Sequence, residues 1–248
     1  MIHYCACLSA SSNGIRRCYK QISNKLLMNF KDIPIIIQAR DRLTCMLQQI
    51  EAFTSRGYNN IHILDVNSSY PPLLEYYKQT PYEVIRLGEN FGHTAFISQG
   101  IVHRFNNDWY CYTDPDVIPD ENCPDDFMEY FYNILQAYPQ ARKAGFGLRI
   151  DDIPDHYNLK NEMIGWENQF WQQKLPPFEA YMAPIDTTFG LCRPGSADVW
   201  AMSARTGFPY VAKHSTWYLD PKNLPEDERY YAEHARTGET NWSGVLLK

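Results

Sequence analysis

Two aspartates separated by one proline, Asp114 and Asp116, are the residues of this chain best suited to chemistry. They follow the apolar, aromatic run Trp109-Tyr110-Cys111-Tyr112, which predicts a buried strand that ends in carboxylates. Carboxylate oxygens suit Mg²⁺ or Mn²⁺, ions that keep some water and take further ligands from the phosphates of a substrate. The pattern therefore indicates a metal that holds a nucleotide diphosphate, and an acidic turn built from Asp and Pro is the alternative.

The composition is that of an acidic, globular protein. The chain has 248 residues, a net charge of -6 and 44% hydrophobic residues, which fits an α/β domain and argues against nucleic acid as the main partner. Its 7 cysteines form no CxxC pair and no zinc spacing, so we expect free thiols in a reducing cytosol. Without an apolar run of about 18 residues or a signal-peptide core, the sequence predicts a cytoplasmic protein.

The N-terminal part of the chain reads as a loose tail, residues 1–13, and a basic helix, residues 15–31. The helix has two interpretations: peripheral contact with an anionic membrane, or packing on its own domain, which we favour. We expect residues 1–32 to form this tail and helix, 33–150 a nucleotide-sugar-binding half, and 151–248 an acceptor-side half of the same domain.

Strands and helices alternate through the middle of the chain. Apolar runs predict strands at 35–38, 61–64, 84–87, 109–114 and 144–150, and helical spacing predicts helices at 43–57, 71–78, 92–105 and 127–135. Beyond residue 150 we expect helices at 159–173 and 225–234, a strand at 187–192 and short strands in the remainder. This alternation predicts a Rossmann-like α/β fold with a mostly parallel sheet and a looser C-terminal part.

Polar segments follow four of the predicted strands. They are Arg40-Asp41-Arg42, Asp65 to Ser69, Asn90-Phe91-Gly92 and Asp114-Pro115-Asp116. Ligands of such sheets bind beyond the carboxyl ends of the strands, so we expect these segments to meet at one rim.

With these motifs the chain resembles the GT-A type of nucleotide-sugar-dependent glycosyltransferase, closest to glycosyltransferase family 2. The resemblance covers residues 33–150 and lies in the order of its motifs. A first strand ends in a polar loop, Ile35 to Arg42, a second ends in Asp65-Val66-Asn67-Ser68-Ser69, an Asn-x-Gly turn follows at Asn90, and Asp114-Pro115-Asp116 comes last.

The resemblance implies a metal-dependent, inverting transfer from a nucleotide-diphosphate sugar, with a UDP-sugar expected, to a saccharide or lipid-linked acceptor in polysaccharide or lipopolysaccharide synthesis. It places the nucleotide sugar on Gln38, Ala39, Arg40, Arg42, Asp65, Asn67, Ser68, Asn90, Gly92 and Asp114. It places Mn²⁺ or Mg²⁺ on Asp114 and Asp116, with the late histidine His214 as a further ligand; a hydrogen-bonded or surface histidine is the alternative for His214.

The general base is open between two residues. Family 2 members often carry a Glu-Asp pair whose Asp is the base, and the pair here is Glu226-Asp227. Pro225 followed by acids is also how a helix begins, which favours a structural role. Asp186, at a predicted loop-to-strand junction, is the other candidate, with a turn-capping role as its alternative.

Two other functions compete with glycosyl transfer. A nucleotidyltransferase resembles this sheet and its carboxylates but has a Gly-rich loop after the first strand, whereas Gln38-Ala39-Arg40-Asp41-Arg42 has no glycine. A non-catalytic carbohydrate-binding protein on a transferase-like fold is the other, and the intact pair of Asp114 and Asp116 argues against it.

Overall fold

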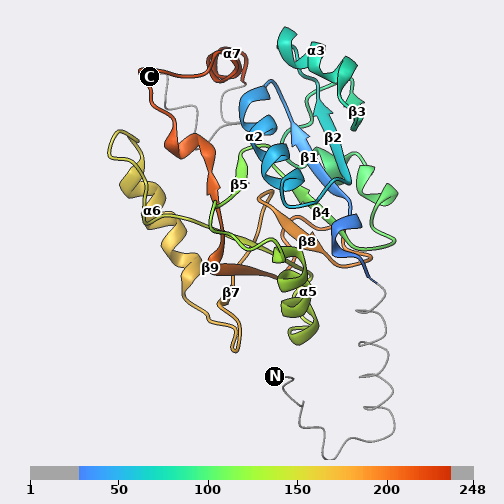
Figure 1. Ribbon diagram of the computed structural model, residues 1–248, viewed down its shortest axis with the longest axis vertical. Coiled ribbons are helices and arrows are strands. Elements are labelled where there is room, and N and C mark those ends of the chain that lie inside the picture. The colour runs from blue at the N-terminus through green and yellow to red at the C-terminus, as the bar shows by residue number, and fades with distance from the viewer. Residues whose placement is uncertain (1–27, 236–248) are drawn as a thin grey trace, which may run out of the picture. The chain divides into compact units, whose positions relative to one another are not determined.

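The computed structural model describes residues 28–235 of the chain (Figure 1). It divides between Phe30 and Lys31, and the elements below belong to the unit that begins at Lys31. The predicted tail and most of the basic helix at 15–31 lie outside the described residues; a short 3-10 turn, η1 (Phe30–Asp32), stands at the end of that range. Among residues 28–235 no helix has the length and apolar character needed to cross a membrane.

The first half of the described chain alternates strands and helices, as predicted. Its elements are β1 (Ile35–Ala39), α2 (Leu43–Thr54), β2 (Ile61–Val66), α3 (Pro71–Gln79) and β3 (Glu83–Leu87). The turn after α2 needs Gly57, whose φ of +83° is strained for any other residue. Helix α3 begins at Pro71, where the missing N–H removes no helical hydrogen bond.

The helix predicted over residues 92–105 is instead two short pieces, and that prediction was wrong. They are α4 (Ala95–Ser98) and the 3-10 helix η2 (Ile101–Arg104), separated by Gly100 with φ +71°. A left-handed residue cannot continue a right-handed helix, so the apolar spacing is retained while the helix is broken. Strand β4 (Tyr110–Thr113) follows and ends directly before Asp114, as predicted.

The second half contains several strands and three α-helices among the described residues. In chain order its elements are β5 (Val117–Pro119), α5 (Phe127–Ala137), β6 (Lys143–Leu148), α6 (Lys160–Asn168), η3 (Gln169–Trp171), β7 (Ala180–Met182), β8 (Gly190–Cys192), β9 (Ser203–His214), η4 (Ser215–Tyr218) and α7 (Glu226–His234). The predicted helices near 127–135, 159–173 and 225–234 are present, and the strand predicted at 187–192 is shortened to β8.

The strands form one mixed sheet in the order β3-β2-β1-β4-β8-β6-β9-β5, with β7 paired to β9. The run β3-β2-β1-β4 is parallel, and β8 lies antiparallel between β4 and β6. This confirms the predicted α/β fold with a mostly parallel central sheet flanked by helices. The antiparallel pairs all involve strands of the second half, which also contains the parallel pair of β6 and β9.

Close backbone contact lets β8 and β9 join this sheet. A Cβ on Gly145 of β6 would lie 1.9 Å from the carbonyl oxygen of Phe189, so only glycine allows the approach of β8. Strand β9 changes register against β6 between Phe146 and Gly147, and this bulge accommodates Pro209 in the middle of a long strand.

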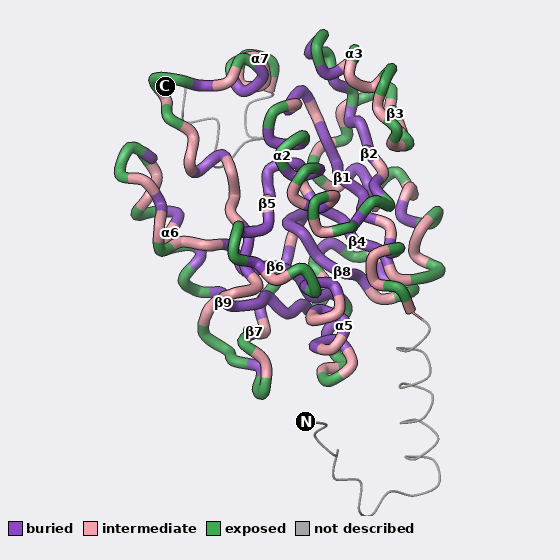
Figure 2. The backbone as a smooth tube through the Cα atoms, viewed as in Figure 1, coloured by how far each residue is buried: buried purple, intermediate pink, exposed green. Residues whose placement is uncertain are grey.

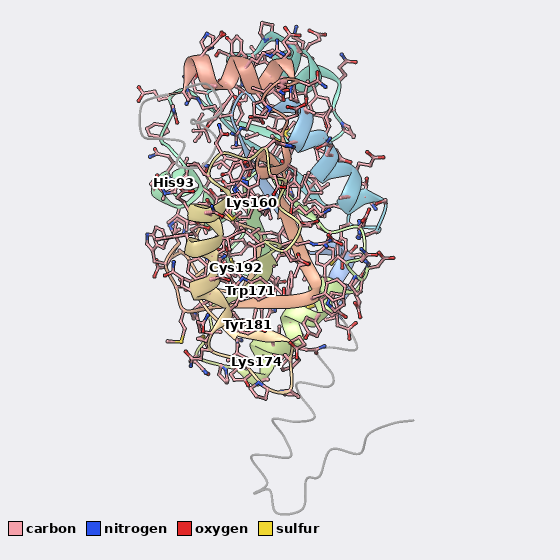
Figure 3. The ribbon with its side chains drawn as sticks, turned by 90° about the vertical axis from the view of Figure 1, so that its left-hand side faces the viewer. His93, Lys160, Trp171, Lys174, Tyr181 and Cys192 are labelled. Carbon is pink, nitrogen blue, oxygen red and sulfur yellow. The ribbon has the colours of Figure 1, made fainter. Side chains whose placement is uncertain are left out.

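The central strands are buried and their carboxyl ends carry the polar segments. All residues of β1, β4 and β8 are buried (Figure 2). In Figure 1 the carboxyl ends of β1 and β2 lie on the side of the sheet where α3 and α7 are drawn. Figure 3, turned to the side of α6, shows Trp171 close to Tyr181 of β7, with ring centroids 5.3 Å apart.

Candidate active site

The loop from Asp114 to Asp116 is bonded to two distant segments of the chain through its backbone. The N–H of Asp114 donates to the carbonyl of Thr187 at 2.8 Å. The carbonyl of Asp116 accepts from the N–H of Ser215, the residue after His214, at 2.7 Å. The loop therefore brings together the segments that carry Asp186 and His214, two residues that the sequence separates from it widely.

Asp116 is buried beside one cation and one imidazole. Its Oδ2 accepts a hydrogen bond from Arg42 at 2.7 Å, and Nε2 of His214 lies 3.7 Å from the same oxygen. Its other oxygen, Oδ1, is buried with no hydrogen-bond partner. A buried carboxylate oxygen without a partner is costly, so this atom is a site where a cation or donor would be stabilised.

Asp114 shares the negative field of Asp116. Its Oδ2 accepts a hydrogen bond from the hydroxyl of Thr187 at 2.5 Å. Burial raises the pKa of Asp114 well above its usual range, and the negative charge of Asp116 raises it further. Two carboxylates held this close in a poorly solvated place favour a positive ligand between or beside them.

His214, the last residue of β9, is held in one orientation. Its Nδ1 lies 2.7 Å from the hydroxyl of Thr216, and its ring stacks on Trp217 with centroids 4.7 Å apart. Burial lowers the pKa of His214, although Asp116 opposes this shift. The neutral imidazole therefore keeps a lone pair, which is the form that ligates a metal.

Asp186 lies in the segment that precedes β8. Its Oδ1 accepts from the N–H of Thr188 at 3.2 Å, and its carbonyl accepts from Nζ of the buried Lys143 at 2.9 Å. Its negative charge contributes to the raised pKa of Asp114 and acts on His214. The three residues therefore belong to one electrostatic site.

Asp227 is used differently. Both of its oxygens bind Thr44 in the first turn of α2: Oδ2 accepts from the N–H at 2.6 Å and Oδ1 from the hydroxyl at 2.8 Å. A carboxylate in this position satisfies a helix N-terminus and interacts favourably with its dipole. Pro225 and the acids after it do begin α7, as that structural reading predicts, but the contact of Asp227 with the start of α2 was not predicted.

Helix α7 also supplies residues that the sequence analysis missed. Glu228 lies 3.3 Å from Nε of Arg42, and the ring of Tyr231 lies under the same guanidinium at 4.1 Å. Arg42, predicted to bind the nucleotide, thus stands between Asp116 and α7. Helical spacing alone could have put Glu228 and Tyr231 on one face, but no pattern tied that face to Arg42.

The predicted nucleoside side of the rim is tightly hydrogen-bonded. Gln38 donates to the carbonyls of Gly92 at 3.2 Å and His93 at 3.0 Å, and the N–H of Gly92 donates to Asn90 Oδ1 at 2.9 Å. The structure thereby brings the end of β1 and the 90–93 turn together. Ala39 is buried in β1, and the guanidinium of Arg40 donates to the carbonyl of His234 at 3.0 Å.

Asp65 is fully buried with partners on both oxygens. Oδ1 accepts from the N–H of Ser68 at 3.1 Å and from the hydroxyl of Tyr77 at 3.2 Å, and Oδ2 lies 3.0 Å from Nε of Arg86. Asn67, in the same loop, is exposed and has φ +61°. Asn67 is thus the predicted residue of this loop whose side chain is accessible to a ligand.

A separate cavity of about 640 Å³ lies along the outer face of α2. Its lining includes Gln48 and Glu51 of α2, Ser215, and Glu228 of α7. Ser215 and Glu228 thus have one side near this cavity and the other near Asp116 or its partner Arg42. The carboxylate site and the cavity are therefore adjacent.

The described residues contain no group of three or more His, Cys, Asp or Glu side chains arranged to hold a metal. Two possible ligands do lie close together: the carboxylate of Asp116, whose Oδ1 has no partner, and the imidazole of His214, whose Nε2 is 3.7 Å from Oδ2 of that carboxylate. This fits an ion such as Mg²⁺ or Mn²⁺ that is bound through one or two protein ligands and completes its shell with water and substrate phosphates.

Comparison with known proteins finds similar chains among solved structures. No protein-family model matches, and no curated protein matches. Among solved structures, residues 1–349 of S. aureus TarS align with a TM-score of 0.44 and 9% identity over 87% of this chain and 69% of that one. A second S. aureus TarS structure aligns with a TM-score of 0.43 and 8% identity over 87% and 42%. A likeness of this degree carries no argument about activity.

Proposed function

We propose that this protein is a glycosyltransferase that moves a sugar from a nucleotide-diphosphate sugar, with a UDP-sugar expected, to a saccharide or lipid-linked acceptor. One observation carries the proposal. The loop of Asp114 and Asp116 is bonded through its backbone to the segments of Asp186 and His214, and it holds a buried carboxylate oxygen without a partner. This arrangement gives the site metal-binding groups and a separate carboxylate.

The nucleotide sugar would lie on the rim formed by the ends of β1, β2 and the 90–93 turn. Asn67 is exposed in the loop after β2, and Arg40 and Arg42 follow β1 and would supply positive charge to the diphosphate. Asp114 would approach the ribose or the metal. The remaining residues predicted for this role, Gln38, Asp65, Ser68 and the turn at Asn90 and Gly92, would shape the pocket through the hydrogen bonds they make with one another.

Asp116 and His214 would hold Mg²⁺ or Mn²⁺, which when bound supplies positive charge for the leaving diphosphate. Arg42 balances the charge of Asp116 through its hydrogen bond to Oδ2. Burial and the bond to Thr216 keep His214 neutral and oriented. These residues together keep the carboxylate side of the site charged and ordered.

Asp186 is the residue we propose as the general base in an inverting transfer. It is near enough to Asp114 and His214 for its charge to act on both. Asp227, the other residue predicted for this role, has both oxygens bound to Thr44 and is therefore not available to an acceptor hydroxyl. An ionised carboxylate near that hydroxyl accepts its proton as the new bond forms.

Nucleotide binding tests the proposal directly. The full chain is mixed with UDP-, GDP- and CMP-sugars, in Mn²⁺ or in EDTA, and thermal unfolding and nucleotide release are measured. We expect one nucleotide class to stabilise the protein only with Mn²⁺, by about 2.7 kcal/mol at a hundredfold excess over its Kd. Asp116→Asn should lose this response, and Asp108→Asn, at the opposite end of β4, should keep it.

Two results would contradict the proposal. In one, no nucleotide sugar stabilises the wild-type protein with or without metal. In the other, Asp116→Asn responds as the wild type does. Stabilisation by a nucleotide sugar with no nucleotide release, even with acceptor saccharides present, would favour the non-catalytic binding protein instead.

A further inference from the structure

Gln49 is a polar residue on the apolar face of α2. Its side chain is completely buried, and the other buried residues of the helix are Cys45, Met46, Ile50 and Phe53. A buried amide costs free energy unless its polar atoms are hydrogen-bonded, so an apolar residue would be the simpler choice here. The contacts of this amide must therefore account for its presence.

The Gln49 amide nitrogen faces the carboxylate loop. Nε2 donates to the carbonyl of Asp114 at 2.8 Å and to the carbonyl of Val117 at 2.6 Å. It also lies 3.3 Å from the hydroxyl of Thr113. Carbonyl oxygens can only accept, so the side chain is oriented with its NH₂ group toward the loop.

These bonds hold both ends of the turn that carries the carboxylates. Asp114 and Val117 begin and end the segment Asp114-Pro115-Asp116-Val117, and one NH₂ group binds both of their carbonyls. Pro115 inside the turn has no N–H to donate. The spacing between the two carboxylates of the loop is therefore fixed from the helix side.

The other end of the Gln49 amide shows what the position costs. Its Oε1 is buried without a hydrogen-bond partner. An unpaired buried acceptor is destabilising, and a methionine of similar size would remove that penalty. Glutamine at this position therefore leaves Oε1 unpaired but supplies two N–H donors to the loop.

Helix α2 meets the carboxylate loop at two points. Arg42, immediately before the helix, bonds the Asp116 side chain, and Gln49, two turns further, bonds the backbone of the loop. The segments of Thr187 and Ser215 hold the loop elsewhere, through the N–H of Asp114 and the carbonyl of Asp116. Gln49 thus connects the backbone of the loop to α2, the helix that follows β1.

We propose that Gln49 is a positioning residue that sets the geometry of Asp114 and Asp116 and thereby the affinity of the site for a divalent cation with a nucleotide diphosphate. The inference rests on the proposed function. Gln49 touches neither ligand: it acts through the backbone of the residues that do. Groups that orient metal ligands in this way typically change metal affinity about 10- to 100-fold when they are replaced.

The test compares Gln49 with its neighbour. Gln49→Met removes the donors at similar volume, Gln49→Glu puts a carboxylate oxygen against the two carbonyls, and Gln49→Asn keeps the donors but shortens their reach. Gln48→Met is the control, because Gln48 is exposed on the same helix. Calorimetry with Mn²⁺ and UDP gives the Kd, and hydrogen exchange gives the protection of amides in residues 110–118.

We expect Gln49→Met and Gln49→Glu to weaken Mn²⁺–UDP binding at least about tenfold and to speed exchange in residues 110–118. Gln48→Met should match the wild type in both measurements. Excess Mn²⁺ should recover nucleotide binding in Gln49→Met, a recovery that general unfolding would not allow. Gln49→Asn, the mildest change, tests the same claim if the other variants fail to fold.

Wild-type Mn²⁺–UDP affinity and wild-type exchange in Gln49→Met or Gln49→Asn would overturn the inference. The proposed function fails in a different way, because the wild-type protein would then bind no nucleotide with Mn²⁺. In that case hydrogen exchange in residues 110–118 still decides whether Gln49 holds the loop. Exchange unchanged by every Gln49 variant would then overturn the inference.

Discussion

The strands on either side of β1 lead to two buried aspartates that are bonded in opposite ways. Asp65 of β2 has partners on both oxygens: Ser68 and Tyr77 on one, Arg86 on the other. Asp116, just beyond β4, has Arg42 on one oxygen and no hydrogen-bond partner on the other. Both side chains are buried, so exposure does not separate them.

The two residues differ in how many of their carboxylate oxygens have a hydrogen-bond partner. This number, more than burial or position at a strand end, distinguishes a structural carboxylate from one that is available to a ligand. A carboxylate with partners on both oxygens stabilises the fold through its hydrogen bonds. A buried carboxylate oxygen without a partner destabilises the fold until a ligand binds it. Asp227 resembles Asp65 in this respect, since Thr44 binds both of its oxygens.

The largest effect should follow from Asp186, the proposed base. Asp186→Asn should keep nucleotide-sugar binding and lower transfer at least about a hundredfold, because the amide cannot accept the acceptor's proton. Initial rates with saturating donor and thermal unfolding measure the two effects separately. Near-normal turnover in this variant, or a product of retained configuration, would remove Asp186 from that role.

Asp65→Ala should act on stability. The change leaves Ser68 N–H and the hydroxyl of Tyr77 without their buried partner, so we expect a loss of about 2–3 kcal/mol in the free energy of unfolding. Asp116→Ala removes the unpartnered Oδ1 together with the Oδ2 that binds the buried Arg42, which keeps Glu228 as a second partner, so we expect a smaller loss of about 1–2 kcal/mol. Chemical denaturation of the two variants compares them. Equal losses would break the distinction between filled and unfilled carboxylates.

The buried pair of Glu167 and Arg205 predicts how the free energy of unfolding depends on pH. Burial raises the pKa of Glu167 to about 7, although Arg205, 2.9 Å away, lowers it. As pH rises from about 4.5 to 7, the unfolded carboxyl loses its proton first, so the folded state binds more protons and loses stability. Between pH 5 and 8 this amounts to roughly 2 kcal/mol.

Denaturation of the wild type and of Glu167→Gln at both pH values measures this contribution. The variant has no group that titrates at that position, so the wild type should lose stability relative to it as pH rises. A difference between the two proteins that does not change with pH would show that Arg205 compensates the burial of the charge completely.

The smallest effect should follow from Asp227. Asp227→Ala removes the partner of Thr44 at the start of α2 and should cost about 1 kcal/mol, the usual scale for a helix cap. The change affects the start of α2 and leaves the contacts of Gln49 with the carboxylate loop in place, so transfer should fall only slightly. Loss of transfer with unchanged stability would return Asp227 to consideration as the base.

Much of the parallel half could be predicted because its signals are local. The apolar stripe of α2, the proline that starts α3 and the strand that ends at Asp114 are each contained in a few neighbouring residues. Periodicity and terminal residues specify such elements directly. The place of Asp114 and Asp116 at the carboxyl edge of the sheet follows from the same signals.

The contacts of the site could not be predicted in this way. The hydrogen bond from Arg42 to Asp116 joins residues 74 apart, and no local pattern selects it. The hydrogen bond from Thr44 to Asp227 joins residues 183 apart. Short strands were expected in this region, but not the single long strand β9, because Gly207 and Pro209 interrupt its pattern and the register change that accommodates them depends on β6.

One measurement tests the central claim most directly: calorimetric titration of Mn²⁺ with UDP into the wild type, Asp116→Asn and Asp65→Asn. The unfilled oxygen of Asp116 predicts metal-dependent nucleotide binding in the wild type, its loss in Asp116→Asn, and its retention in whatever fraction of Asp65→Asn is folded. Binding that survives in Asp116→Asn, or that Asp65→Asn abolishes while remaining folded, would contradict the account.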